Sequence, residues 1–465
     1  MKTRIDFKYL LSLELTDPGC DFSVLSEFRS RVLKGGLEEI FLTTLLSICR
    51  ERGWVKERGK QRTDSTHIEA AIRTMNRIEC AGETLRAALN SLAVVVPDWL
   101  RAHTPQAWYD RYALRIQDFR MPRETTKLQA LVEQIGQDGW EALNWIWETD
   151  APSWLRNIPA VEILRCVWLQ QFWIEDGKIG WRSNDNIPPS SLLIASPYDT
   201  QAHLNIKRDI VWTGYKAHLT ETCDDVSPHL ILHVETTAAT TQDMEMTSII
   251  HQRLERKQLL PSEHLMDTGY VDGEHLVTSQ RTYGVEIIGP VAVNGSWQSK
   301  SPEGLDNTQF LIDWEKKNVT CPQGKTSKKW TVKQDKNVSD VIRAQFSKKD
   351  CLACSVRSQC TRAAVNPRQI VFRQREHHEA IQAARKRQTT KAFKERYAKR
   401  SGIEGTISQG VRAFGLRVSR YLGQEKKHLQ HVLIATAMNV VRLFQWQMGA
   451  TPSQRHISHF ASLAL

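Results

Sequence analysis

Three acidic residues that lie far apart in the sequence stand where a carboxylate could bind a metal ion: Asp64, Asp267 and Glu404. In the segment HLMDTGYVDGE, Asp267 follows two apolar residues and precedes the turn Thr268-Gly269-Tyr270. This pattern is typical of a buried strand that ends in a charged group at the edge of a sheet, followed by a helix. Taken alone, Asp267 could equally be a turn residue or a helix cap.

The other two acids also have ordinary structural explanations. Asp64 lies between two hydroxyl residues in GKQRTDSTHIEAAIR. Because Lys60–Thr66 is too polar to be predicted as a strand from propensity, Asp64 alone would be interpreted as the N-cap of a helix over Ile68–Ala71. Glu404 lies beside a predicted apolar helix stripe of Ile403, Ile407 and Val411. It could bind a metal at the border of helix and sheet, or form an i−4 salt bridge to Arg400.

If the three carboxylates meet, they supply the charge to hold two divalent ions, Mg²⁺ or Mn²⁺, roughly 4 Å apart. Two such ions activate the attacking oxygen and neutralise the leaving oxygen in phosphodiester cleavage. Without metal the carboxylates would repel one another, so their pKa values are expected to be raised.

A second set of candidate ligands consists of four cysteines, Cys321, Cys351, Cys354 and Cys360. A C-x₂-C pair with two further cysteines nearby favours a structural Zn²⁺ site. The long gap after Cys321 and the x₅ spacing before Cys360 depart from common zinc fingers, so four ordinary reduced thiols remain the alternative.

The segment from residue 385 is strongly basic and interrupted by few acids, which favours contact with phosphates. A basic helix that only promotes solubility is the alternative. The candidate DNA-binding residues are Arg385, Lys386, Arg387, Lys391, Lys394, Tyr397, Arg400, Arg412 and Arg417. The whole chain of 465 residues carries 63 Lys and Arg against 52 Asp and Glu, which also favours a polyanionic partner such as nucleic acid.

The start of the chain has no signal-peptide core, and no apolar run is long enough to span a membrane. We therefore expect a cytoplasmic, nucleoid-associated protein with reduced cysteines. The length allows two to four domains.

The predicted elements place the acids on different parts of an α/β fold. Residues 5–58 are predicted to be helical, and 70–180 are helical and rich in tryptophan, which more simply fills a core than stacks on bases. The alternating runs 212–222 and 229–237 predict an antiparallel hairpin. A helix over 243–256, the strand ending at Asp267, a further helix and a strand over 285–290 follow. A last amphipathic helix is expected over Lys427–Met448.

Four segments occur in an order that resembles the DDE transposases of bacterial insertion sequences: TDSTHIEAAIR, DTGYVDGE, the C-x₂-C segment and RSGIEGTISQGVRAFGLR. Within the wider insertion-sequence-four/five-like transposases, the closest group is the one numbered eleven eighty-two. The resemblance implies an RNase H-like mixed sheet whose first three strands are antiparallel. It assigns the catalytic, Mg²⁺-binding acids to Asp64, Asp267 and Glu404, and makes Lys60–Thr66 a strand.

The family signature Tyr-x₂-Arg-x₃-Glu-x₆-Lys/Arg matches Tyr397, Arg400 and Glu404, whereas its final basic position holds Val411. The resemblance implies double-stranded DNA as partner, namely terminal inverted repeats and target DNA, and a homo-oligomer that pairs two ends. Relatives have another helical segment before the equivalent of Met1, so residues 1–58 are expected to be a shortened N-terminal region. A decayed or domesticated DNA-binding protein, and a nuclease that does not join strands, are the alternatives.

The expected organisation is as follows: 1–58 helical N-terminal region, 59–69 first core strand, 70–185 helical insertion, 186–290 core, 291–384 cysteine-containing insertion, and 385–465 C-terminal helices that complete the core.

Overall fold

The computed structural model describes residues 4–207, 209–225, 227–334, 340–449, 460 and 463. Its centre is a six-stranded mixed sheet in which β1 (Arg58–Glu69) lies between β5 (Ile210–Thr222) and β7 (Pro261–Met266). β1 pairs antiparallel with β5 and parallel with β7, and β7 pairs parallel with β8 (Glu286–Ile288). On the far side of β5, β6 (Ile231–Ala238) and β4 (His203–Lys207) both pair with it in antiparallel fashion.

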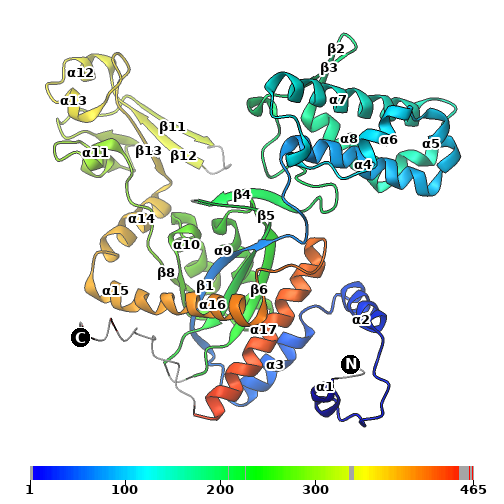
Figure 1. Cartoon of the computed structure of the whole chain (residues 1–465). Coiled ribbons are helices and arrows are strands. Elements are labelled where there is room, and N and C mark those ends of the chain that lie inside the picture. Colours follow the sequence, from blue (N-terminus) through cyan, green and yellow to red (C-terminus); the bar gives the residue numbers. More distant parts are fainter. Residues whose placement is uncertain are drawn as a thin grey trace.

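The predicted hairpin and the strand ending before Asp267 are therefore confirmed, and the antiparallel start of the sheet is consistent with an RNase H-like fold (Figure 1).

The polar segment around Asp64 is a strand and not the start of a helix, which the sequence pattern alone would not predict. Its side chains are buried with partners: Gln61 donates to the Leu259 carbonyl at 2.6 Å, and the Thr63 hydroxyl lies 2.7 Å from both Thr220 Oγ1 and His264 Nε2. Because most of these buried polar groups, though not Gln61 Oε1, find a partner on a neighbouring element, the tertiary structure outweighs the poor strand propensity.

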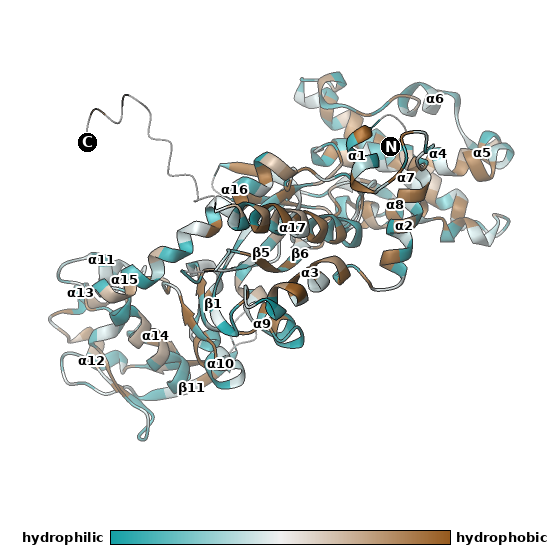
Figure 2. Ribbon diagram, turned by 90° about the horizontal axis from the view of Figure 1, so that it is seen from below, coloured by the Kyte–Doolittle hydropathy of each residue, from teal (hydrophilic) through white to brown (hydrophobic). Residues whose placement is uncertain are grey.

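Helices cover both faces of the sheet, as the alternation of side chains along β6 demonstrates. Thr236 Oγ1 lies 2.8 Å from His431 Nδ1 of α17 (Gln424–Gln447), whereas the adjacent Glu235 pairs with Arg253 of α9 (Met246–Arg256) at 3.4 Å. Successive residues of a strand point to opposite faces, so α17 and α9 lie on opposite sides. Figure 2 shows that α17 presents hydrophobic residues along the central strands. The shared core includes Leu219, Ile250 and Met438.

The other elements around the core follow the predicted order. After β7 come the 3₁₀ turn η5 (Thr268–Tyr270) and α10 (Gly273–Tyr283), and η4 (Asp243–Glu245) precedes α9. The basic segment forms α14 (Arg375–Arg387), α15 (Lys391–Ala398), η7 (Lys399–Ser401) and α16 (Gly402–Phe414). On α16, Ile403 and Ile407 are buried, which confirms the predicted apolar stripe.

The tryptophan-rich segment packs around its own core and projects from one side of the sheet (Figure 1). Trp108 and Trp168 are buried there, but Trp147, Trp154 and Trp173 are exposed. Its helices are α4 (Arg77–Val95), α5 (Pro97–His103), α6 (Gln106–Tyr112), α7 (Thr125–Trp147) and α8 (Pro159–Gln171), with the 3₁₀ turns η1 (Asp118–Arg120), η2 (Ser153–Asn157) and η3 (Asn184–Asn186). The prediction of helix over 70–180 is wrong at the end of this segment, where β2 (Phe172–Glu175) and β3 (Lys178–Trp181) form a hairpin.

The cysteine-containing segment has a small sheet of its own, β11 (Lys329–Gln334), β12 (Asp340–Gln345) and β13 (Gln369–Arg373). Around it lie β9 (Leu311–Asp313), β10 (Asn318–Thr320), α11 (Trp297–Lys300), α12 (Lys348–Leu352), α13 (Arg357–Cys360) and η6 (Asn307–Gln309). Phe310, Phe346 and Phe372 belong to its apolar core.

The N-terminal region is helical as predicted, with α1 (Ile5–Leu10), α2 (Phe22–Lys34) and α3 (Ile40–Glu51). The Asp21 carboxylate caps α2 by accepting a hydrogen bond from the Ser23 N–H at 2.9 Å. Within the described ranges, no helix combines the length and the apolar character needed to cross a membrane.

Candidate active site

The register of two parallel strands brings Asp64 and Asp267 together. Thr63 on β1 is paired with Met266 on β7. The residue after each of them is an aspartate, so Asp64 and Asp267 lie side by side where the pairing of the two strands ends. Asp267 also caps η5, since its side chain accepts a hydrogen bond from the Gly269 N–H at 2.8 Å. The cap and the strand-edge position were alternatives for this residue, and the structure has both.

A single guanidinium group, that of Arg400, contacts all three predicted acids. Arg400 Nη2 lies 2.6 Å from Asp64 Oδ2 and 3.8 Å from Asp267 Oδ2, and Arg400 Nη1 lies 2.9 Å from Glu404 Oε1. The i−4 salt bridge considered for Glu404 is therefore present, and Arg400 also pairs with Asp64 and Asp267. The carboxylates of Asp64, Asp267 and Glu404 thus gather around one cation.

Tyr397, the first residue of the family signature, lies close to the same group of charges. Its ring stacks on Phe393 with centroids 5.7 Å apart. Burial raises the pKa of its hydroxyl, Arg400 lowers it, and the negative charges of Asp267, Asp64 and Glu404 raise it further. Three residues of the signature, Tyr397, Arg400 and Glu404, therefore face one site.

Asp64 is the acid whose protonation the site changes most. Burial raises the pKa of its carboxyl to about 6, with Arg400 and the Ser65 N–H acting in the opposite direction and Asp267 raising it further. The pKa of Asp64 is raised as expected, but the loss of hydration on burial raises it more than the repulsion from Asp267 does.

This pKa predicts a pH-dependent cost of folding in metal-free protein. Between about pH 4 and pH 6 folded Asp64 keeps a proton that the unfolded chain has lost, so the free energy of unfolding falls by about 2–3 kcal/mol as pH rises through that window. Asp64→Asn cannot ionise, and urea denaturation with EDTA should show the variant gaining stability over the native protein from pH 4 to pH 6.5. Parallel stability curves would mean that Asp64 titrates normally.

The helix that carries Glu404 is fixed to the sheet by a buried ion cluster. Glu221 of β5, fully buried, accepts from Arg62 Nε at 2.6 Å, from Arg442 Nη1 at 2.8 Å and from the Thr406 hydroxyl of α16 at 2.6 Å. Arg62 Nη1 also donates to the Lys399 carbonyl at 2.6 Å, directly before Arg400. We call Arg62, Glu221 and Arg442 the buried ion cluster.

Close packing explains the glycine at the start of α16. A Cβ on Gly402 would lie 2.0 Å from Arg62 Nη1, so any side chain there would displace the guanidinium. The buried ion cluster and Gly402 together determine how near Arg400 and Glu404 come to Asp64.

A fourth acid, Asp243 at the start of η4, lies beside the three predicted ones. Its carboxylate accepts from Ser65 Oγ at 3.2 Å and pairs with Lys216 Nζ at 3.2 Å. A Cβ on Gly269 would be 3.0 Å from Asp267 Oδ1 and 3.4 Å from Asp243 Oδ2, so these two carboxylates share one glycine turn. Asp243 was not predicted as a site residue; its position at the start of a helix, five residues after the end of the hairpin strand β6, was the only signal.

Two further acids that could serve as fallback metal ligands, Asp199 and Asp272, have partners of their own. Asp199 binds Lys427 Nζ and the Tyr215 hydroxyl, and Asp272 caps α10 through the His275 N–H. Among the basic residues, Arg385 donates to the Ala292 carbonyl, Arg387 pairs with Glu286 and Arg417 donates to Thr66. The exposed cations of the segment include Lys386, Lys391, Lys394 and Arg412.

The four cysteines lie around one pocket of about 540 Å³ in the cysteine-containing segment. Burial raises the pKa of the Cys360 thiol, and nearby Cys351, Cys354 and Cys321 raise it further. In the part of the chain that the structure describes, no group of three or more His, Cys, Asp or Glu side chains is arranged to hold a metal ion as it stands. The four thiols lie around one pocket, as expected for ligands of one zinc ion. Their present positions, however, do not form a complete four-ligand site.

Comparison with known proteins supports one class of enzyme. Residues 320–444 match the model of a family described as a transposase DDE domain. The match includes the four cysteines, the basic segment and Glu404, and it begins after Asp64 and Asp267. No curated protein matches the chain. The match supports a DDE transposase, and hence an enzyme.

Proposed function

We propose that this chain is a DNA transposase of a bacterial insertion sequence that cleaves and joins phosphodiester bonds at the element's ends. The contact of Arg400 with Asp64, Asp267 and Glu404 is the observation that supports it best, because it gathers acids from β1, β7 and α16. The match to a transposase DDE domain and the resemblance to the eleven-eighty-two group agree with it.

The donor chemistry of the residues present fits divalent cations, since Mg²⁺ prefers carboxylate oxygens and three carboxylates gather around Arg400. Within the described residues the three acids are not arranged to hold an ion while Arg400 lies among them. Asp64, Asp267 and Glu404 would hold two Mg²⁺ or Mn²⁺ ions, which supply Lewis acidity and a stronger nucleophile when bound. Arg400 would have to release the acids for this. Asp243, held by Lys216 and Ser65, would keep a fourth carboxylate beside the Gly269 turn.

Strand transfer distinguishes this function from the alternatives. Labelled DNA carrying the candidate inverted repeats of the proposed element would be incubated with the protein, Mg²⁺ and a target plasmid. A transposase should nick the ends and join the 3′-hydroxyl to the plasmid. Nicks without joined product indicate a nuclease, and DNA binding without nicks indicates a decayed element.

We also propose that the exposed cations of α14 and α15 contact DNA phosphates. Lys386, Lys391 and Lys394 are exposed, whereas Arg385 and Arg387 also bind groups of the protein, so the three lysines are the test set. Replacing the three lysines by glutamine should flatten the slope of log affinity against log salt by about 2.7, or about 0.9 for each lost contact.

The control for this salt titration is a triple glutamine variant of Arg101, Arg123 and Lys127, which are exposed on the tryptophan-rich segment. It removes the same charge and should leave the slope unchanged. If the control flattens the slope and the lysine variant does not, the tryptophan-rich segment is the DNA-binding surface.

Finally, we propose that Cys321, Cys351, Cys354 and Cys360 bind one structural Zn²⁺ as thiolates. Purified protein should contain one equivalent of zinc, and Cys354→Ser should lose most of it and unfold the cysteine-containing segment at lower temperature. Cys166→Ser, on the tryptophan-rich segment, is the matched control and should keep the metal. Protein that is equally stable with and without a chelator, and free of zinc, would contradict this proposal.

A further inference from the structure

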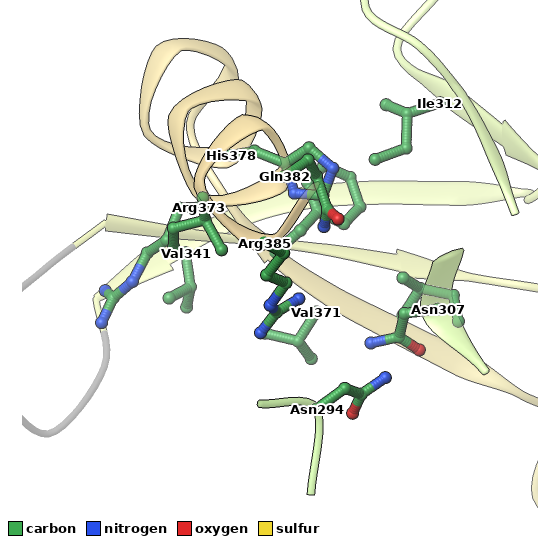
Figure 3. Close-up of a pocket in the computed structure, with 12 residues that line it drawn as sticks. Asn294, Asn307, Ile312, Val341, Val371, Arg373, His378, Gln382 and Arg385 are labelled. Atoms are coloured by element: carbon green, nitrogen blue, oxygen red, sulfur yellow. The ribbon is translucent and has the colours of Figure 1, made fainter. Parts of the chain in front are cut away.

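A second pocket, of about 340 Å³, lies between α14 and the small sheet of the cysteine-containing segment. Figure 3 shows Gln382 and Arg385 pointing into it from α14, with Asn307 and Asn294 across from them and Val371 beneath. Its volume is within the range of small-ligand sites, and amides and a cation over an apolar floor are the lining expected of such sites.

The polar groups of the pocket are oriented by bonds at its rim. The Asn307 side-chain oxygen accepts from Arg368 Nη2 at 2.8 Å, which turns the amide NH₂ group of Asn307 toward a ligand. Arg385 donates to the Ala292 carbonyl through Nε at 3.3 Å and Nη2 at 3.1 Å, and its Nη1 can still donate. The pocket therefore offers amide donors and acceptors beside a fixed guanidinium group.

The apolar lining of the pocket comes from both sides of β13. Val371 lines it from one face of the strand, and Ile370 and Phe372 from the other, where the His378 ring lies against Phe372 with centroids 5.8 Å apart. A planar ring with polar edges would bury its faces against these groups and present its edge to Asn307 and Gln382.

The wall of the pocket is connected to the second acid of the candidate active site through α10. α14 packs on the first residue of α10, where a Cβ on Gly273 would lie 2.6 Å from the His377 carbonyl oxygen and 2.9 Å from Ile381. α10 follows the turn η5 after Asp267. The pocket and Asp267 are therefore joined by two packed helices.

We propose that this pocket binds one unpaired nucleotide of the DNA substrate, with the base against Asn307 and Gln382 and its phosphate at Arg385. This inference rests on the proposed function for the DNA, but not on any cleavage step. A free nucleotide and a nucleotide within DNA offer the pocket the same base and phosphate, and the experiment below distinguishes the two.

The test compares two duplexes at one salt concentration, without divalent metal: one fully paired, the other with a single 2-aminopurine nucleotide left unpaired. Native protein should bind the second duplex about tenfold more tightly, with a rise in 2-aminopurine fluorescence as the base leaves the stack. The double variant Asn307→Leu with Gln382→Leu should bind both duplexes equally.

Two single variants serve as a matched pair. Arg385→Gln should reduce the preference for the unpaired nucleotide, whereas Lys386→Gln, its exposed neighbour with the same loss of charge, should weaken both duplexes alike and keep the ratio. If the double variant does not fold, Arg385→Gln against Lys386→Gln decides the question alone.

Equal binding of both duplexes by a protein that cleaves inverted repeats would overturn this inference and leave the proposed function intact. A thermal shift with 5′-deoxynucleoside monophosphates, but no preference between duplexes, would make the pocket a site for free nucleotides and overturn its assignment to DNA. A preference for the unpaired nucleotide in a protein that never cleaves would support the pocket and count against catalysis.

Discussion

Replacing Asp64 or Asp267 by asparagine, or Glu404 by glutamine, is expected to reduce DNA cleavage in Mg²⁺ on the order of a thousandfold or more. Each change removes one of the carboxylate charges gathered at Arg400, and the same side-chain volume remains. DNA affinity measured without divalent metal should change little, since no candidate DNA-binding cation is removed. Cleavage rates on labelled inverted-repeat DNA and binding by fluorescence anisotropy measure the two effects.

Glu395→Gln is the matched control, because Glu395 is exposed on the neighbouring α15 and pairs with Lys391 at 3.8 Å. It should cleave at the native rate. If Glu404→Gln cleaves normally while Asp243→Asn does not, then Asp243 is the third metal-binding acid and Glu404 only holds Arg400. If all variants cleave like the native protein, the chemistry lies elsewhere in the molecule.

The core around Asp267 could be predicted because its sequence is locally consistent. The apolar residues of β7 and the alternation in β5 and β6 predict strands, and the structure places strands there. The strand β1 could not be predicted by propensity, since its buried Gln61, Arg62 and Thr63 are polar and become favourable only through partners from distant segments.

The sequence indicated which acids could meet but not how they are arranged. Arg400 was a candidate for DNA contact and for an i−4 salt bridge to Glu404; the structure shows that it contacts three carboxylates, which depends on the register of β1 with β7. Asp243 lies at the start of η4, where an acid is common for local reasons, so only the tertiary approach to Gly269 distinguishes it. The β2–β3 hairpin was missed because the residues up to 180 were included in the helical, tryptophan-rich segment.

Glu221→Ala is expected to destabilise the protein by about 3–5 kcal/mol, because it leaves the buried guanidinium group of Arg62 and the partly buried one of Arg442 without their anion. Glu221 is fully buried and binds both Arg62 and Arg442. Urea denaturation measures the loss. Asp225→Ala is the control: it removes an exposed partner of Lys399 and should cost less than about 1 kcal/mol.

Replacing the whole buried ion cluster separates its two roles. With Arg62→Met, Glu221→Leu and Arg442→Met together, no buried charge is left unpaired, so most of the stability should return. Cleavage should not return, because Arg62 no longer holds the Lys399 carbonyl and η7 is free to move Arg400 and Glu404 away from Asp64. A triple variant that is stable and also fully active would mean that the cluster serves folding alone, and that α16 is positioned by its apolar face, through Ile403 and Ile407.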